Sequence, residues 1–282
     1  MPGVGGKEEI AVKSVAHNSN FNPLNYPISL IYPGRIDVSA WIGHVPFGMY
    51  LLDVLRPKAI AELDTHCGVS YCAFCQAVKE YGGFSPLTKG TFDEALGCFA
   101  DHTFDLLNID GFHTYEAVKQ DFEKWLPKLT DRGVVLFHDI NVRERESEVW
   151  KFWEELKPGF PHFEFAHSHG LGVLAVGKGY PDELNELFQC SAEAATKIRS
   201  FFACLGARLE AAQELQLSKA ATSQLSDEFH IEKEKNEDQR VRLLEIQRQL
   251  GACRNNGQKD FAEKILPHNC PLTSFSIASN GF

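Results

Sequence analysis

The chain has 282 residues, of which 44% are hydrophobic and 23% are charged, a composition typical of globular proteins and unlike that of disordered or fibrous chains. The formal net charge of −10 disfavours a nucleic-acid partner, because phosphate binding depends on clustered Lys and Arg. No apolar run approaches the roughly 18–20 residues of a membrane helix, and the first residues lack a secretory signal pattern. We therefore expect a cytoplasmic protein with neither a membrane nor a nucleic-acid partner.

Eight cysteines are spread along the chain. Because no export signal is visible, we expect them to be reduced thiols. Cys72 and Cys75 form a C-x-x-C pair, but no second pair accompanies them, as a typical zinc site would require. Both lie in an apolar helical pattern, so we interpret them as small buried hydrophobic residues.

Residues 1–45 are predicted to form an irregular arm, because asparagines and prolines interrupt every regular pattern there. A helix is predicted from Phe47 to Leu55, where Arg56 and Pro57 end it. Short apolar runs then alternate with helical patterns. Strands are predicted over residues 59–63, 103–109, 133–138, 163–166 and 172–176, and helices over residues 70–81, 91–99, 115–126 and 146–156.

This alternation predicts an α/β fold with a doubly wound, mostly parallel sheet, which we assign to residues 46–180. Only residues 167–171 join the last two predicted strands. A connection this short cannot hold a crossover helix, so these two strands are predicted to form an antiparallel hairpin at the sheet edge.

The character of the sequence changes after Pro181. Residues 182–206 are predicted to be helical, and residues 207–252 contain no glycine or proline before Gly251. The leucines of this stretch are spaced too irregularly for strict heptads. A long helix with weak coiled-coil character and a plain solvated helix both fit the pattern. We assign residues 181–256 to a helical extension and residues 257–282 to a tail.

Titratable side chains lie at the carboxyl ends of three predicted strands. They are Glu62 and Asp64 at the first, Asp110 and His113 after the second, and His138 and Asp139 at the third. In an open parallel sheet these ends share one edge, and ligands bind there. Turns with a purely structural role would favour Gly, Asn or Ser, so we predict one shared site.

The turn after the first strand reads E-L-D-T-H-C-G-V-S and contains one glycine, Gly68. It is neither a G-x-G-x-x-G motif nor a P-loop, which argues against dinucleotides and nucleoside triphosphates. An acidic strand end beside such a turn suits a ligand without phosphates. S-adenosylmethionine is a ligand of this kind, with hydroxyls for carboxylates and an amino-acid end for backbone groups.

Three of the sequence blocks that carry a resemblance are A-E-L-D-T-H-C-G (61–68), I-D-G-F-H-T-Y (109–115) and G-V-V-L-F-H-D (133–139), of which the last two are specific when taken together. Through these blocks, residues 58–177 resemble the class I S-adenosylmethionine-dependent methyltransferases, specifically the small bacterial type that is often found with glycosyltransferases. More distantly, they are similar to the metal-dependent sugar and antibiotic O-methyltransferases.

The resemblance implies a shortened Rossmann-like fold and methyl transfer to a hydroxyl of a sugar or small metabolite, assisted by a divalent cation such as Mg²⁺. It implies cofactor binding by Glu62, Asp64, Thr65, Gly68, Asp110 and His113, cation binding by Asp110 and Asp139, and catalytic roles for His138 and Asp139. A bound cation lowers the pKa of a substrate hydroxyl, and the alkoxide can then attack the sulfonium methyl. The C-terminal helix would contact a second copy or a glycosyltransferase partner.

Two features depart from the family's pattern. Asp64 stands where the family usually has glycine. Some forty residues that hold the family's second strand and its ribose-binding acidic residue are missing, because residues 81–84 join the flanking blocks directly. Asp93 and Glu94 are the candidates to take over the role of that acidic residue. A non-catalytic interaction module, assembled through residues 207–252, is therefore an alternative function.

A third function, a metal-dependent hydrolase, also fits the aspartates and histidines at the strand ends. Structural roles are open as well. Thr114 can cap a helix beside His113, His138 can be a buried histidine bonded to the backbone, and Asp139 can cap a turn. His167 and His169 flank the predicted hairpin, and we expect them to be exposed and without a role.

Overall fold

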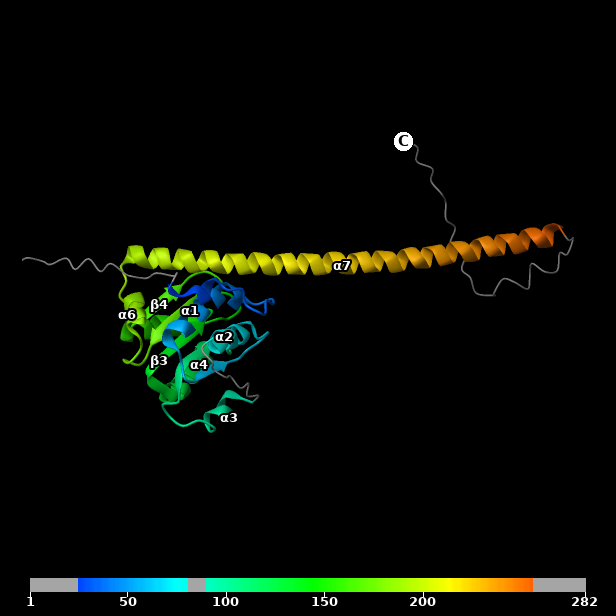
Figure 1. The fold of residues 1–282 in the computed structure, drawn as a ribbon. Helices are drawn as coiled ribbons and strands as arrows, with labels where there is room; N and C mark the ends of the chain where they lie inside the picture. The colour runs from blue at the N-terminus through cyan, green and yellow to red at the C-terminus, as the bar shows by residue number, and fades with distance from the viewer. Residues whose placement is uncertain (1–24, 81–89, 256–282) are drawn as a thin grey trace, which may run out of the picture. The chain divides into compact units, whose positions relative to one another are not determined.

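The computed structural model describes residues 25–80 and 90–255, which form a five-stranded mixed sheet with helices on both faces (Figure 1). The strands are β1 (Ile60–Leu63), β2 (Phe104–Ile109), β3 (Leu129–His138), β4 (His162–Phe165) and β5 (Leu171–Ala175). The helices are α1 (Val45–Leu55), α2 (Val69–Glu80), α3 (Phe92–Leu96), α4 (Tyr115–Trp125), α5 (Val149–Leu156), α6 (Asp182–Phe188) and α7 (Ala192–Asn255). The predicted α/β class is confirmed.

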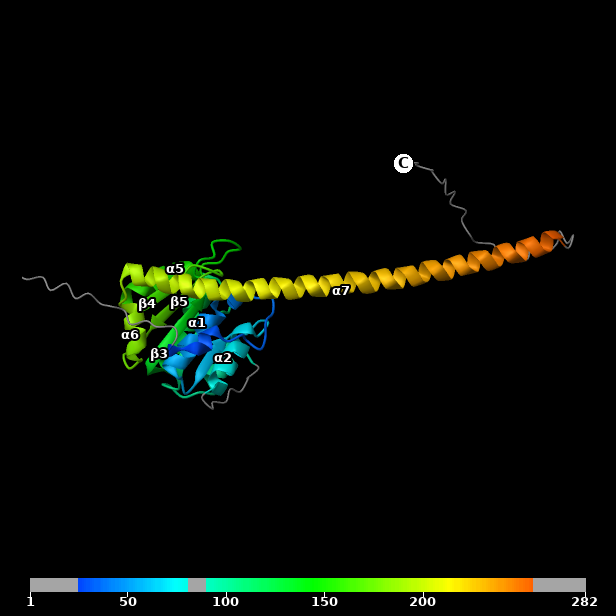
Figure 2. The ribbon, with the colours of Figure 1, turned by 45° about the horizontal axis from the view of Figure 1, so that its top comes forward.

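The strand order in the sheet is β1-β2-β3-β5-β4. β1, β2 and β3 are parallel, and β5 is antiparallel to both of its neighbours. The predicted hairpin of β4 and β5 is therefore present at one edge (Figure 2), with β5 as the strand that joins β3. β1 is the opposite edge of the described sheet. Leu63, Ile109 and Phe137 lie side by side in register, so the residues after them emerge at one edge.

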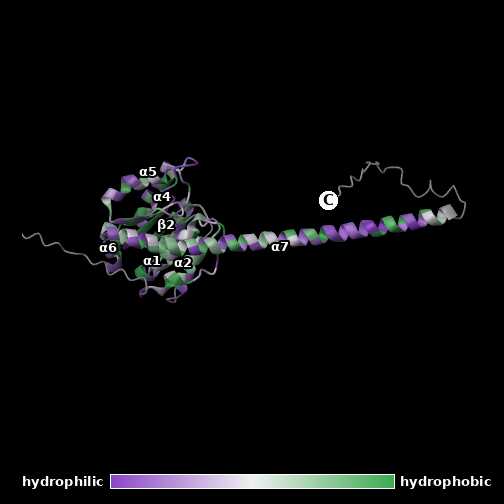
Figure 3. Cartoon of the chain, turned by 90° about the horizontal axis from the view of Figure 1, so that it is seen from above, coloured by the Kyte–Doolittle hydropathy of each residue, from purple (hydrophilic) through white to green (hydrophobic). Residues whose placement is uncertain are grey.

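Two apolar layers cover the sheet, because successive side chains of a strand point to opposite faces. Leu106 and Val134 pack with α1, α2, α6 and the start of α7, whereas Leu107 and Val135 pack with α4 and α5. Figure 3 shows α4 and α5 on one side of β2 and α1 and α2 on the other. The burial of both faces explains why the strands are continuously apolar in sequence.

The described part of the predicted arm packs into this core. It forms two short 3-10 helices, Pro27–Leu30 and Ala40–His44. Trp41 is buried, and its ring packs edge-on against Phe74 of α2 at 5.4 Å between centroids. Residues 25–45 of the arm therefore form part of the hydrophobic core.

α7 runs without interruption over 64 residues. Its buried residues Ile198, Phe202 and Leu209 join the core, whereas every side chain from Glu214 to Ala252 is exposed. The chain divides into two units between Leu215 and Gln216, close to this change. The predicted tail, residues 257–282, lies outside the described residues.

Two further sequence expectations can be compared with the described part of the chain. Cys72 and Cys75 are free thiols on α2, but they are half-buried rather than fully buried. Over residues 25–80 and 90–255, none of the helices combines the length and apolar character needed to cross a bilayer.

The start of α7 lies against the backbone before α1, and glycine makes this contact possible. A Cβ atom on Gly206 would overlap the carbonyl oxygen of Gly43. We expect Gly206→Ala to lower the free energy of unfolding by about 3 kcal/mol, because the helix must move away from a packed neighbour. Urea denaturation measures this change. Gly251→Ala is the control, because nothing lies within 4 Å of that position, and it should not reduce stability. Equal stability of the two variants would contradict the prediction.

Candidate functional site

The polar residues predicted at the strand ends lie at one edge of the sheet. Glu62 is the third residue of β1, Asp110 directly follows β2, and His138 is the last residue of β3, with Asp139 next. The backbone N–H of Asp110 donates to the carbonyl oxygen of Leu63, which extends the pairing of β1 and β2 to this edge. The parallel register thus brings carboxylates from three separate chain segments to one edge.

Two aspartates and three histidines form a connected cluster there. His113 Nε2 lies 2.9 Å from Asp139 Oδ2, and His138 Nδ1 lies 3.0 Å from Asp110 Oδ1 and 3.2 Å from Asp139 Oδ1. His169 Nδ1 lies 3.1 Å from the same Asp139 oxygen. Asp139 therefore contacts all three imidazoles.

In this cluster the negative aspartates and the positive histidines stabilise each other's charged forms. The carboxylates of Asp110 and Asp139 raise the pKa of His113 to about 9. Burial opposes the charge of His138, but the same two carboxylates outweigh burial and raise its pKa to about 10. Burial also opposes ionisation of Asp139, yet His113 and His138 hold the pKa of that carboxyl well below its usual range. The aspartates are thus ionised at neutral pH, as cation ligands must be.

One ligand atom each from Asp110, His113 and Asp139 lies within 4.8 Å of the others. Two carboxylate oxygens and, once His113 has released its proton, one imidazole nitrogen are donors that a single divalent cation can share. Asp139 has a φ of 62°, in the left-handed region that is uncommon for residues with a side chain.

A second polar group lies on β1 and β2. Asn108 is fully buried, and its Nδ2 donates to Glu62 Oε1 at 3.0 Å. Glu62 Oε2 and Asn108 Oδ1 are buried and have no hydrogen-bond partner within the described ranges. Burial raises the pKa of Glu62 to about 7, although hydrogen bonds from Ser70 and Asn108 oppose this effect. Unpaired buried acceptors cost free energy, so this pair is suited to receive donors from a ligand.

The turn after β1 explains why Asp64 can occupy a glycine position. Asp64 has a φ of 69° and Gly68 a φ of 75°, both in the left-handed region that glycine favours. Aspartate tolerates this region, and Asp64 Oδ1 accepts a hydrogen bond from the backbone N–H of His66 at 3.0 Å. The side chain of Asp64 is exposed, and Gly68 N–H donates to the carbonyl oxygen of Thr65, which closes the turn.

Asp93 and Glu94, the candidates to replace the missing acidic residue, have local roles. Lys124 Nζ lies 2.6 Å from Asp93 Oδ1, and Glu94 forms a capping box with Thr91 at the start of α3. Both aspartate and glutamate are exposed. Both carboxylates therefore have partners within the protein, and no ligand is needed to explain their positions.

Some contacts of the cluster could not be read from the sequence. The hairpin turn carries His169 to Asp139, because Leu171 of β5 is in register with His138. His169 is exposed as expected, but it contacts the cluster. His167 is half-buried rather than exposed, and its Nε2 lies 3.2 Å from the carbonyl oxygen of Gly43. Only the paired strands bring this turn to the end of β3.

The contacts of His113 and His138 bear on the structural roles that the sequence left open for them. Thr114 caps α4, since its hydroxyl accepts from the backbone N–H of Ala117, and His113 is the residue before this cap. His138 bonds to carboxylates rather than to backbone, and the ring of Trp41 stacks on it at 5.9 Å between centroids. Ser168, next to His169, donates its hydroxyl hydrogen to Glu210 of α7.

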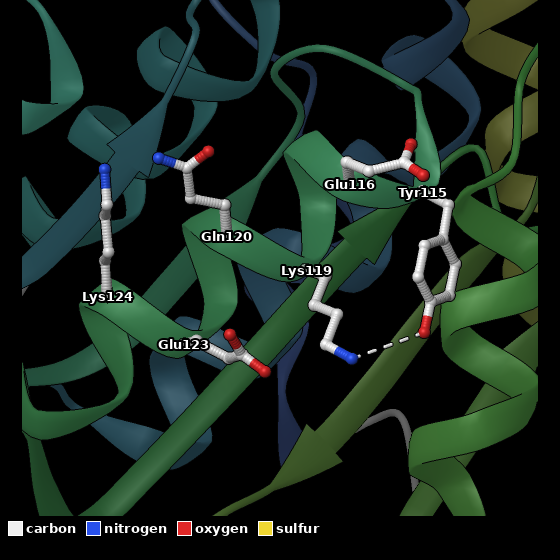
Figure 4. A pocket seen from close by; sticks show the side chains of 6 residues that line it. All are labelled: Tyr115, Glu116, Lys119, Gln120, Glu123 and Lys124. Atoms are coloured by element: carbon white, nitrogen blue, oxygen red, sulfur yellow. Dashed lines mark hydrogen bonds between the residues drawn. The ribbon is translucent and has the colours of Figure 1, made fainter.

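A pocket on the surface lies elsewhere, along one side of α4 (Figure 4). It is lined by Tyr115, Glu116, Lys119, Gln120, Glu123 and Lys124. Lys119 Nζ lies 3.5 Å from Tyr115 Oη across it. A hollow built from one helix lacks the convergent groups of several elements that define a ligand site, so the strand-end cluster is the better candidate.

Residues 80–140 match the family model described as a methyltransferase domain, and this segment includes Asp110, His113, His138 and Asp139. The chain is also 40% identical over 213 residues to the uncharacterized protein y4gI of Sinorhizobium fredii. That match covers 62% of this chain and 23% of the relative, so the chain spans about a quarter of the relative's length.

Two solved structures are similar at low identity. A candidate caffeoyl-CoA O-methyltransferase from Staphylococcus aureus is 19% identical, with a TM-score of 0.39, over 48% of this chain and 83% of its own. The Podospora anserina methyltransferase PaMTH1, bound to S-adenosylhomocysteine, is 15% identical, with a TM-score of 0.37, over 47% and 77%. Scores this low carry no argument about function. The family match and the sheet described above establish that the chain contains a methyltransferase-like domain.

Proposed function

We propose that this domain transfers a methyl group from S-adenosylmethionine to a hydroxyl of a sugar or other small acceptor, with a divalent cation bound at the strand ends. The observation that carries the proposal is the convergence of Asp110, His113 and Asp139 within 4.8 Å, inside the segment that matches a methyltransferase domain.

The cofactor would bind beside β1. S-adenosylmethionine carries an ammonium group, a sulfonium and ribose hydroxyls, so it offers both positive charge and hydrogen-bond donors. Glu62 Oε2 and Asn108 Oδ1 are buried acceptors without a partner among residues 25–80 and 90–255. The turn from Asp64 through Thr65 to Gly68 directly follows β1, and Asp64 and Gly68 both have left-handed backbone there.

The cation would be held by Asp110, His113 and Asp139. When bound, it would lower the pKa of the acceptor hydroxyl and stabilise the alkoxide. The side chain of His113 is 43% exposed while its Nε2 is buried against the aspartates, so an acceptor would approach the cluster past this imidazole. Phe112 next to it is 82% exposed, and its ring can cover the carbon skeleton of a small acceptor.

His138 would position the ligands rather than act as the base. It is only 3% exposed, which keeps it from an acceptor, and its Nδ1 lies between the carboxylates of Asp110 and Asp139. Its stacking on Trp41 fixes the ring plane. The imidazole therefore orients the two carboxylates that receive the cation.

A non-catalytic interaction module is the second candidate. Two observations favour it: β1 is the edge of the described sheet, and Asp93 and Glu94 are held in local contacts. The acidic residue that grips ribose in the resembling family thus has no counterpart in the described part of the chain.

Calorimetric titration of the full chain with S-adenosylmethionine, with and without Mg²⁺, distinguishes these functions. Methyl transfer predicts cofactor binding that Mg²⁺ strengthens. No cofactor binding at millimolar concentration would overturn the proposal in favour of the interaction module. Binding of Mg²⁺ alone would overturn it in favour of a metal-dependent hydrolase.

A further inference from the structure

The part of α7 that lies beyond the hydrophobic core, residues 215–250, exposes many large apolar side chains. Its large hydrophobic side chains are between 44% and 67% exposed. They are Leu215, Leu217, Leu225, Phe229, Ile231, Val241, Leu243, Leu244, Ile246 and Leu250. A helix that stays solvated is polar on all sides, so this composition indicates a missing partner.

Six of these ten side chains lie on one seam with spacings of three and four residues. The seam runs through Leu215, Ser218, Thr222, Leu225, Phe229, Glu232, Asn236, Gln239, Leu243, Ile246 and Leu250. The leucines alone look irregular because polar residues occupy the intervening seam positions. Residues 215–250 cover five heptads, or about 54 Å of helix, which exceeds the three to four heptads that a coiled coil needs.

We propose that residues 215–250 form a parallel, two-stranded coiled coil with a second copy of this chain. In heptad notation the a positions are Leu215, Thr222, Phe229, Asn236, Leu243 and Leu250, and Leu225 and Ile246 occupy d. Asn236 is the one amide at an a position. A single buried asparagine there pairs with its copy, which fixes the register and favours two strands over higher oligomers.

Charges beside the seam select the parallel orientation. In a parallel pair, the residue before each a position faces the residue five places later in the other copy. The facing pairs are Glu214 with Lys219, Glu228 with Lys233, and Lys235 with Arg240. The first two pairs have opposite charges. The third has like charges, but Arg240 already lies 3.6 Å from Glu237 of its own helix, which reduces the repulsion.

The antiparallel arrangement pairs like charges instead. When it aligns Leu225 with Leu250, the flanking contacts bring Lys233 against Arg240 and Lys235 against Arg242. Each contact occurs twice in a symmetric pair, and no glutamate faces a lysine. Repulsion at all these contacts disfavours the antiparallel dimer.

Sedimentation of the full chain at about 10 μM tests the dimer. The wild-type chain should sediment at twice its 31.6 kDa. Phe229→Asp should weaken dimerisation at least tenfold, because it replaces two large apolar side chains of the seam with two charges, one turn from the Glu232 side chains that already lie on it. Ile231→Asp is the matched control, two residues away and off the seam, and it should remain dimeric. Phe229 and Ile231 are 67% and 53% exposed, so neither change disturbs the fold of one copy. A monomeric wild type, or equal behaviour of both variants, would overturn the proposal.

Cysteine cross-linking tests the orientation. Ser218 is at a d position, where a parallel pair brings the two copies of one residue together, whereas Ser223 points away from the seam. After mild oxidation, the Ser218→Cys variant should give a disulfide between two copies of residue 218, identified by peptide mass spectrometry. The Ser223→Cys variant should not. Absence of the bond at residue 218 in a dimeric chain would exclude the parallel register.

Discussion

Asp139→Asn is expected to weaken Mn²⁺ binding by about 100-fold or more, equivalent to about 3 kcal/mol. The change removes one negative charge from the three groups that converge within 4.8 Å. It preserves the size of the side chain, and asparagine tolerates the left-handed φ of 62° at this position. Titration of the full chain with Mn²⁺, followed by electron paramagnetic resonance, measures the effect. The strengthening of S-adenosylmethionine binding by the cation should disappear in the same variant.

Asp93→Asn is the matched control for this experiment. Its carboxylate is 68% exposed and pairs with Lys124 of α4. Removal of that charge changes the net charge of the chain by the same amount but leaves the strand ends intact. Unchanged Mn²⁺ affinity in Asp139→Asn, or an equal loss in both variants, would show that the cation is bound elsewhere.

Glu62→Gln is expected to change how stability depends on pH. Burial raises the pKa of Glu62 to about 7, above its ordinary value of 4.5, so the folded chain keeps a proton that the unfolded chain releases. The stability that Glu62 contributes is complete below about pH 4.5 and is lost as the pH rises towards 7. Glutamine has no such loss. The variant should therefore gain about 3 kcal/mol relative to wild type between pH 4.5 and pH 8.

Urea denaturation at several pH values between 4.5 and 8 measures this difference. Glu94→Gln is a control with the opposite sign, because hydrogen bonds from Thr91 lower the pKa of Glu94. Its wild-type carboxylate loses its stabilising contribution only as the pH falls below its ordinary pKa of 4.5, so that variant should be less stable than wild type by a nearly constant amount between pH 4.5 and pH 8. Parallel pH profiles for Glu62→Gln and wild type would mean that the Glu62 carboxyl is solvated in the folded chain.

The core elements could be predicted because burial of both sheet faces leaves continuous apolar runs in the sequence. Two boundaries differ for identifiable reasons. β3 begins at Leu129 rather than at residue 133, because the pairing of β2 and β3 shifts register between Phe104 and Leu106 and accommodates polar residues. α5 begins at Val149 rather than at residue 146. Arg145 and Glu146 have left-handed backbone, which helical periodicity cannot reveal.

The only site residues that could be predicted from the sequence are those whose position follows from the strand that they end. Glu62, Asp110 and Asp139 are at or just beyond strand ends, so their common edge follows from parallel pairing. His169 and Trp41 reach the cluster through the hairpin turn and the N-terminal arm. Such contacts depend on tertiary packing between distant segments, and a periodic pattern carries no information about them.

The first turns of α7 have consequences for anyone who wishes to isolate the sheet and its helices. Ile198, Phe202 and Leu209 belong to the core, and Glu210 accepts a hydrogen bond from Ser168 in the turn whose His169 contacts Asp139. A chain that ends before Ala192 would lack these core side chains. It would also lack the hydrogen bond that holds the turn next to the site. Ending the chain after Leu215 would keep these core contacts and remove the part of α7 that we propose as the dimer contact, together with the residues that follow it.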